Sequence, residues 1–448
     1  MALTVLMAFH IADANSQSED SDSQEAVDER RAREAALDED PESARRATRQ
    51  SRDAPASAEV ELQTIIEERR IDEAALNEDP EAERRSRAQI AGDDPTADAR
   101  FKSWLFDFYA SARVHYVNTF DVETFERKSR IADGNSRAGA RAEWEFKPDW
   151  YLYGRAEIGI DVVESFSTRA QQFGDGGFET RLLYAGLDWD HFTLVYGQNW
   201  SAYYQVAGIT DRFAAYGGSA SGIYNAGTVG QATGTGRADD VLQARVYVDD
   251  KKWLGNFKPF NINMQVQRSQ PIPRVDGESY DYGVGASAWL ETETEFGIGL
   301  AYNRSRIEDI TRPGIVAAGI DGDAVAAALS TRSFGSRWYV SLVYSTLSNM
   351  ETTDLGKYFN GYGVEVYGQW EMVDNWWLIG GLNAIEPDQD DPDVGEFRVR
   401  YAVVGARYSF DSFKRMVYVE YRINEGRLTD GSRPKDEVTV GIRWDFGD

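Results

Sequence analysis

The chain of 448 residues contains no cysteine, which excludes disulfide bonds and thiolate metal sites. It has no run of 18 or more apolar residues, so the sequence predicts no transmembrane helix. It has only three histidines, His10, His115 and His191, which argues against a histidine-dependent hydrolase. The net charge of −27 offers no basic patch and argues against a nucleic-acid partner.

What the chain does contain is 12% aromatic residues and forty glycines, at a mean hydropathy of −0.52. Hydropathy alone would class such a chain as soluble. A membrane β-barrel escapes that test, because only alternate residues of each strand face lipid and the average over a strand is polar. The composition therefore fits an outer-membrane protein better than a cytosolic enzyme.

The N-terminus predicts an export signal over residues 1–14. An apolar run from Met1 to Phe9 precedes Ala12-Asp-Ala14, which has the small-x-small spacing of a signal-peptidase site. Cleavage there would leave Asn15 as the first residue. The basic segment that usually begins such a signal is missing, and a chance apolar N-terminus is the alternative.

Residues 15–100 form a charged extension with an internal repeat. The segment Glu34–Glu42 returns almost unchanged as Glu73–Glu81, about 39 residues later. Ala, Glu and Arg favour helices, and the Asp-Pro pair in each copy would interrupt them. The apolar positions are too few for a sustained heptad seam. We expect solvated helical segments, with a disordered periplasmic tail and a coiled-coil or cell-wall-binding stalk as alternatives.

From Phe101 onward the chain changes to alternating segments of about ten residues, the length of a membrane-spanning strand. In the last one, Val438, Val440, Ile442, Trp444 and Phe446 share one face. Short turns alternate with long loops, roughly 161–178, 199–239, 305–322, 347–361, 386–396 and 425–435. The sequence thus predicts an all-β, antiparallel transmembrane barrel of about 16 strands over residues 101–448. Its weakest strand is the tenth, near Ala324 to Thr331.

Aromatic residues gather beside the short turns, which predicts an interfacial girdle at the periplasmic rim of the barrel. These residues are Phe146, Trp150, Trp189, Phe192, Trp370, Trp376, Trp377, Phe410, Phe413, Trp444 and Phe446.

Five strand segments have distinctive sequences. They are Ser136–Arg141, Arg181–Leu187 (Arg-Leu-Leu-Tyr-Ala-Gly-Leu), Val195–Asn199 (Val-Tyr-Gly-Gln-Asn), Val403–Phe410 and Val417–Asn424. These segments resemble strands of the general, non-specific trimeric porins of the Gram-negative outer membrane. The resemblance covers most of residues 104–446 and none of residues 15–100. One departure is at the C-terminus, where Gly447 and Asp448 follow the final aromatic residue.

The resemblance implies a homotrimer in the outer membrane, in contact with lipid and lipopolysaccharide, that passes small hydrophilic solutes and ions. It implies no enzymatic activity and no cofactor. The extension 15–100 would lie in the periplasm, where it could contact the cell wall.

The resemblance also implies that the long segment 199–239 folds into the barrel and narrows the pore. Thr210–Gly218 is similar to the family's loop motif, but Asp211 keeps only the first acid, Ala215 replaces the second and Arg212 is added. The family's arginine ladder on the opposite wall maps onto Arg137 and Arg181, and less directly onto Arg237.

Acids facing arginines across a narrow gap create a strong transverse field that favours polar solutes. With one acid replaced, we expect near-neutrality or a weak preference for anions. The remaining predicted lumen residues are Arg113, Arg141, Arg155, Glu157 and Arg443. The alternation of residues does not settle the direction of Arg181, since Leu187 and Trp189 share its face unless a β-bulge intervenes.

Three alternatives remain. A substrate-selective channel would use lumen aromatics, for which Tyr151, Tyr153, Tyr203 and Tyr204 are candidates. An anchor protein would use the barrel only to hold residues 15–100, and a barrel enzyme is disfavoured by the histidine count. The acidic loop Asp388–Asp393 could hold a divalent cation, but a solvated acidic loop is the favoured interpretation, since the segment lacks the glycine and the distal glutamate of an EF-hand.

Overall fold

The computed structural model describes residues 105–122, 124–165, 178–189, 191–248, 254, 257–273, 279–307, 322–331, 336–388, 394–411 and 414–447. The predicted signal, the repeat-containing extension, Phe413 and most of the acidic loop lie outside these ranges. No helix within them is long and apolar enough to span a membrane.

The described residues form one antiparallel sheet that closes on itself, because β1 pairs with β18 as well as with β2 and β3. The strands are β1 (Leu105–Phe120), β2 (Arg127–Asp133), β3 (Arg137–Lys147), β4 (Trp150–Ile160), β5 (Phe178–Trp189), β6 (Phe192–Trp200), β7 (Arg237–Val248), β8 (Phe260–Gln267), β9 (Gln270–Pro271), β10 (Ser279–Glu291), β11 (Gly297–Ile307), β12 (Gly322–Ser330), β13 (Trp338–Thr352), β14 (Tyr358–Val373), β15 (Trp376–Pro387), β16 (Val399–Asp411), β17 (Arg415–Asn424) and β18 (Asp436–Phe446). Three short helical turns, α5 (Val162–Ser165), α7 (Tyr204–Ala207) and η3 (Gly208–Thr210), lie in the connections.

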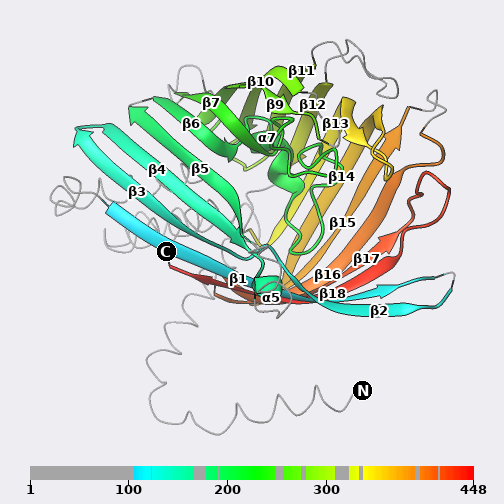
Figure 1. Ribbon diagram of the computed structural model, residues 1–448. Helices are drawn as coiled ribbons and strands as arrows, with labels where there is room; N and C mark the ends of the chain where they lie inside the picture. The colour runs from blue at the N-terminus through cyan, green and yellow to red at the C-terminus, as the bar shows by residue number, and fades with distance from the viewer. Residues whose placement is uncertain are drawn as a thin grey trace, which may run out of the picture. The chain divides into compact units, whose positions relative to one another are not determined.

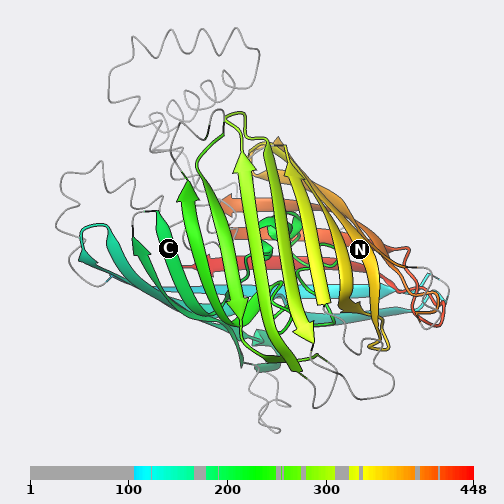
Figure 2. The same cartoon turned by 90° about the horizontal axis from the view of Figure 1, so that it is seen from above.

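The eighteen labelled strands correspond to sixteen strands of a barrel. Both β2 and β3 pair with β1, and both β8 and β9 pair with β10, so each of these two pairs is one barrel strand with an interruption. Figures 1 and 2 show the strands wrapped around a loop that follows β6. The predicted closed barrel of 16 strands is therefore confirmed, and its tenth strand in barrel order, β12, spans Gly322–Ser330.

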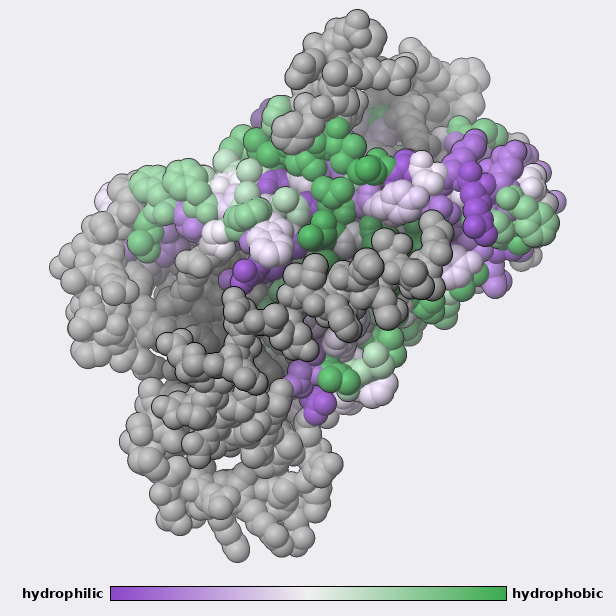
Figure 3. All heavy atoms as spheres, turned by 90° about the horizontal axis from the view of Figure 1, so that it is seen from below, coloured by the Kyte–Doolittle hydropathy of each residue, from purple (hydrophilic) through white to green (hydrophobic). Residues whose placement is uncertain are grey.

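Alternation along each strand separates an apolar outer face from a polar inner one. On β11, Leu300 is 63% exposed while Asn303, three residues further along, is buried, and on β8 Val266 is exposed while its neighbour Gln265 is buried. Figure 3 shows part of this surface, where apolar side chains gather. An outer face of this kind is stable in lipid, because the closed ladder leaves no unpaired strand edge.

Two details of the sequence prediction were wrong. The connection between β13 and β14 is a short turn over residues 353–357 rather than a long loop from 347 to 361. Both strands extend well past the predicted ends, because Ser348, Glu351 and Thr352 still pair with β14, across a β-bulge at residues 349–350. Trp377 points into the barrel and is 5% exposed, whereas its neighbour Trp376 faces outward at 45%. Adjacent residues of a strand cannot both belong to the outer girdle.

The connection between β6 and β7, residues 201–236, folds into the barrel and packs against its inner wall. Tyr203, Val206 and Ile223 of this loop are buried with the inward faces of β11 to β13. On β12 the inward residues are Ala324, Ala326 and Ala328, all fully buried. These small side chains leave the space that the loop occupies, which explains why β12 has the least distinctive strand sequence.

Candidate functional site

Two buried carboxylates fasten the tip of the inward loop to the barrel wall. Glu365 of β14 accepts hydrogen bonds from the backbone N–H groups of Gly218 and Ala220, at 2.8 and 3.3 Å. Glu420 of β17 accepts from the N–H groups of Ala214 and Ala215, at 2.7 and 2.9 Å. Hydrogen bonds to a carboxylate are stronger than neutral ones, so these four contacts fix the position of the tip.

Polar side chains of β8 and β11 hold the far end of the same loop. Gln265 donates to the carbonyl oxygen of Gly234 at 2.8 Å, and Asn303 donates to that of Thr233 at 2.7 Å. The inward polar face of β8 is therefore not open to the lumen, since Gln265 binds the loop and Asn263 is buried against Ser287.

Between the loop and the opposite wall lies a cavity of ≈ 390 Å³. Among the described residues that line it are seven arginines and a single carboxylate, Asp211. The arginines come from six strands and the loop, and they are Arg113, Arg137, Arg181, Arg212, Arg237, Arg407 and Arg443. The structure thus brings all five predicted constriction residues to one cavity. Their role in conduction stays a prediction.

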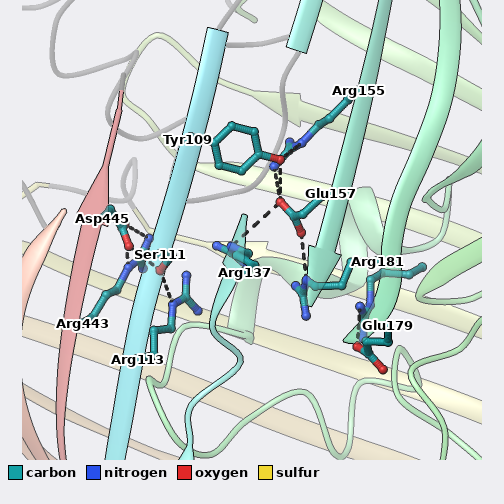
Figure 4. Close-up of polar contacts among 11 residues, drawn as sticks. Tyr109, Ser111, Arg113, Arg137, Arg155, Glu157, Glu179, Arg181, Arg443 and Asp445 are labelled. Atoms are coloured by element: carbon teal, nitrogen blue, oxygen red, sulfur yellow. Dashed lines mark hydrogen bonds and ion pairs between the residues drawn. The ribbon is translucent and has the colours of Figure 1, made fainter. Parts of the chain in front are cut away.

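Glu157 is the centre of the arginine cluster on the wall (Figure 4). It is 1% exposed and forms ion pairs with Arg155 at 2.7 Å, Arg181 at 2.8 Å and Arg137 at 3.9 Å. The hydroxyl of Tyr109 donates a further hydrogen bond to Glu157 at 2.7 Å. One carboxylate shared by three guanidinium groups leaves this wall with net positive charge.

A β-bulge turns Arg181 into the barrel. On β4, the adjacent residues Glu157 and Ile158 pair with Leu182 and Thr180 of β5. Arg181, between these two partners, is therefore the extra residue of the bulged strand. Arg181 and Leu182 are consequently both buried, although they are neighbours. The bulge resolves the direction of Arg181, which the sequence left open.

The other predicted lumen residues continue the charged wall. Arg113 of β1 and Arg443 of β18 line the cavity, and Arg443 pairs with Asp445 (Figure 4). Arg141 and Arg155 lie next to each other across β3 and β4, on the short-turn side of Arg137, and do not line the cavity. Their guanidinium groups lie over the ring of Tyr109 at 4.7 and 4.9 Å.

The loop side of the cavity is itself of mixed charge. Asp211 accepts a hydrogen bond from the hydroxyl of Tyr224 at 2.6 Å. Next to it is Arg212, whose carbonyl oxygen accepts from Arg407 of β16 at 3.1 Å. Arg407 also donates to the Tyr367 hydroxyl at 2.9 Å. Burial raises the pKa of the loop residue Tyr216 to about 12, so its phenol stays neutral.

Arg407, Glu365, Glu420 and Trp200 were not predicted as site residues. Arg407 and Glu420 lie on the polar faces of alternating strands, which shows that they point inward but not that they meet the loop. Of the four tyrosines considered for a selective channel, Tyr204 lines the cavity, whereas Tyr203 is fully buried between loop and wall.

Metal binding has no support within the described part of the chain. No group of three or more His, Asp or Glu side chains there is placed to hold an ion. Residues 389–393 of the acidic loop lie outside the described ranges, so the cation hypothesis stays untested.

A closed barrel with an apolar exterior, an inward loop and a charged inner cavity defines a membrane channel of the porin class. The chain is 26% identical over 356 residues to the outer membrane porin PhoE of Enterobacter cloacae, which covers 76% of this chain and 91% of that protein. It is 26% identical over 354 residues to outer membrane protein S2 of Salmonella typhi, over 69% of this chain and 85% of that protein. No protein-family profile matches the chain.

Solved structures share the fold. The structure of Salmonella typhi OmpF in complex with daunomycin has a TM-score of 0.61 and 22% identity, over 76% of this chain and 97% of that one. An anion-selective porin from Comamonas acidovorans has a TM-score of 0.55 and 14% identity, over 77% of this chain and all of that one. By its barrel and by these relatives, the chain is similar to the general porins of the Gram-negative outer membrane.

Proposed function

We propose that the chain forms a passive diffusion channel for small hydrophilic solutes and ions, narrowed between the inward loop 201–236 and the wall of β1 to β5. The observation that carries this proposal is the arrangement of charge inside a closed barrel. Arginines of the wall face Asp211 and Arg212 of the loop across one cavity, while the outer face is apolar. Such a site selects solutes by size and charge and requires no covalent chemistry.

Planar-bilayer recording of the purified protein tests this function directly. We expect insertion to produce ohmic, water-filled channels, because guanidinium and carboxylate groups in the cavity require hydration. Conductance in steps of three would support a homotrimer, which the porin relatives favour. Insertion without any conductance would contradict the channel and favour an anchoring role.

A barrel in the outer membrane would have different partners at its outer face, its long-loop end and its periplasmic end. In the outer membrane, the apolar outer face would contact lipid, and the long-loop end would contact lipopolysaccharide. We place the predicted extension 15–100 in the periplasm, where its repeated charged segments are available to the cell wall or to a partner protein.

A chain that begins at Ala99 should fold and conduct as the full chain does. All strand pairings of the described barrel join residues between Leu105 and Phe446, so closure requires nothing before them. The sequence before residue 100 also offers little apolar surface to bury. Heat-modifiable migration on gels and bilayer recording check the two parts of this prediction. Loss of assembly in the truncated chain would make the extension part of the barrel's structure.

A further inference from the structure

The indole N–H group of Trp200 is a buried hydrogen-bond donor of the cavity that has no acceptor among the described residues. Trp200, the last residue of β6, lines the cavity and is 3% exposed. Its indole Nε1 group has no hydrogen-bond partner among the described residues. A buried N–H without an acceptor is unfavourable, and such groups are found where a ligand or water supplies the missing oxygen.

The position of Trp200 is fixed from both sides. Its ring stacks on that of Tyr204, with 3.9 Å between centroids, and its carbonyl oxygen accepts a hydrogen bond from Gln243 at 2.7 Å. Across the ladder it pairs with Arg237 of β7, another residue of the cavity lining. The indole is therefore a rigid donor beside a guanidinium group.

The surrounding charges define which ligand this donor suits. Seven arginines of the lining present guanidinium groups, which are donors without an acceptor atom. The one carboxylate of the described lining, Asp211, accepts the hydrogen bond of Tyr224. Donors exceed acceptors here, so a ligand with several oxygen acceptors and more than one negative charge is complementary to the cavity.

We infer that this cavity is a saturable binding site for small multivalent oxyanions, with the Trp200 indole donating to one oxygen and the arginines neutralising the charge. The inference rests on the proposed channel and specifies the solute class that its constriction retains. Chloride satisfies the charge but offers no fixed set of oxygen acceptors, whereas a tetrahedral oxyanion can accept from a guanidinium fork and an indole at once. Because the cavity lies between the loop and the wall, a bound oxyanion obstructs other ions.

Inorganic phosphate is the probe. We expect phosphate, added to the wild-type protein in a planar bilayer bathed in chloride, to reduce the chloride current along a saturating curve. In Trp200→Phe, which keeps the ring and removes only the N–H group, the phosphate concentration for half-reduction should rise about tenfold, as expected for loss of one charge-assisted hydrogen bond. The phosphate curve of each variant is normalised to the chloride current of that variant without phosphate.

Two variants serve as controls. Trp370→Phe changes a tryptophan that is 54% exposed on the outer face of β14 and should leave the phosphate curve as in wild type. Arg237→Gln removes a guanidinium group of the cavity lining and should also weaken phosphate binding, so it tests the site even if Trp200→Phe does not assemble. A conducting wild-type channel with no phosphate effect, or equal phosphate curves for wild type, Trp200→Phe and Arg237→Gln, would overturn the inference and leave the channel intact. Absence of any conductance would instead overturn the proposed function.

Discussion

Gly363→Ala should release the tip of the inward loop from β14 and raise the single-channel conductance. A Cβ atom added at Gly363 would lie closer than 3.0 Å to the carbonyl oxygen of Ala220, a backbone atom that cannot rotate away. Two residues along β14, Glu365 holds Gly218 and Ala220. Displacing the backbone there removes both hydrogen bonds, which costs about 3 kcal/mol of anchoring. The loop should then sample positions that leave the cavity wider.

Gly368→Ala is the matched control, because it lies on the same strand and its added Cβ atom would meet nothing nearer than 3.8 Å. We expect its conductance to equal that of wild type. Glu365→Ala removes the same two acceptors without adding bulk and should also raise the conductance. If Gly363→Ala and Glu365→Ala both assemble and both conduct as wild type does, the tip is not held by β14.

The barrel could be predicted from the sequence because its main determinant is local. Each strand carries its own alternation, and residues such as Val440 and Leu300 face lipid whichever strands lie beside them in the barrel. Strand ends were harder to predict. The inward–outward alternation stops after Ser348, since Asn349 to Thr352 are all buried, and only the pairing with β14 shows that the strand extends to Thr352.

The site was predictable only in part, for the same reason. Alternation distinguishes inside from outside, but it does not show what occupies the inside. Gln265 and Arg407 both lie on inward faces and both bind the backbone of the loop, yet of the two only Arg407 lines the cavity. The direction of Arg181 depends on a bulge opposite Glu157 and Ile158, a feature of pairing that one strand's sequence does not contain.

The charge of the cavity should make the channel prefer anions, although the chain carries a net charge of −27. Much of the negative charge lies outside the cavity, whereas the described lining has seven arginines and one aspartate. Three of the compensating carboxylates, Glu157, Glu179 and Asp445, are already paired with wall arginines. The cavity therefore retains positive charge on the wall of β1 to β5 and, through Arg212 of the loop and Arg407 of β16, on the side where the loop lies.

Reversal potentials under a salt gradient measure this preference. Arg212→Ala and Arg181→Ala should each move the reversal potential toward cations, and Asp211→Asn should move it further toward anions. One unit charge about 8 Å from a passing ion, at an effective dielectric constant of about 40, changes the ion's energy by about 1 kcal/mol, which is several-fold in relative permeation.

Arg306→Ala is the control, because it removes an arginine from outside the cavity lining and should have little effect on the reversal potential. All shifts should shrink near 1 M salt, where the Debye length falls to about 3 Å. Strong cation selectivity that none of the three cavity substitutions alters would show that charges elsewhere in the barrel set the field.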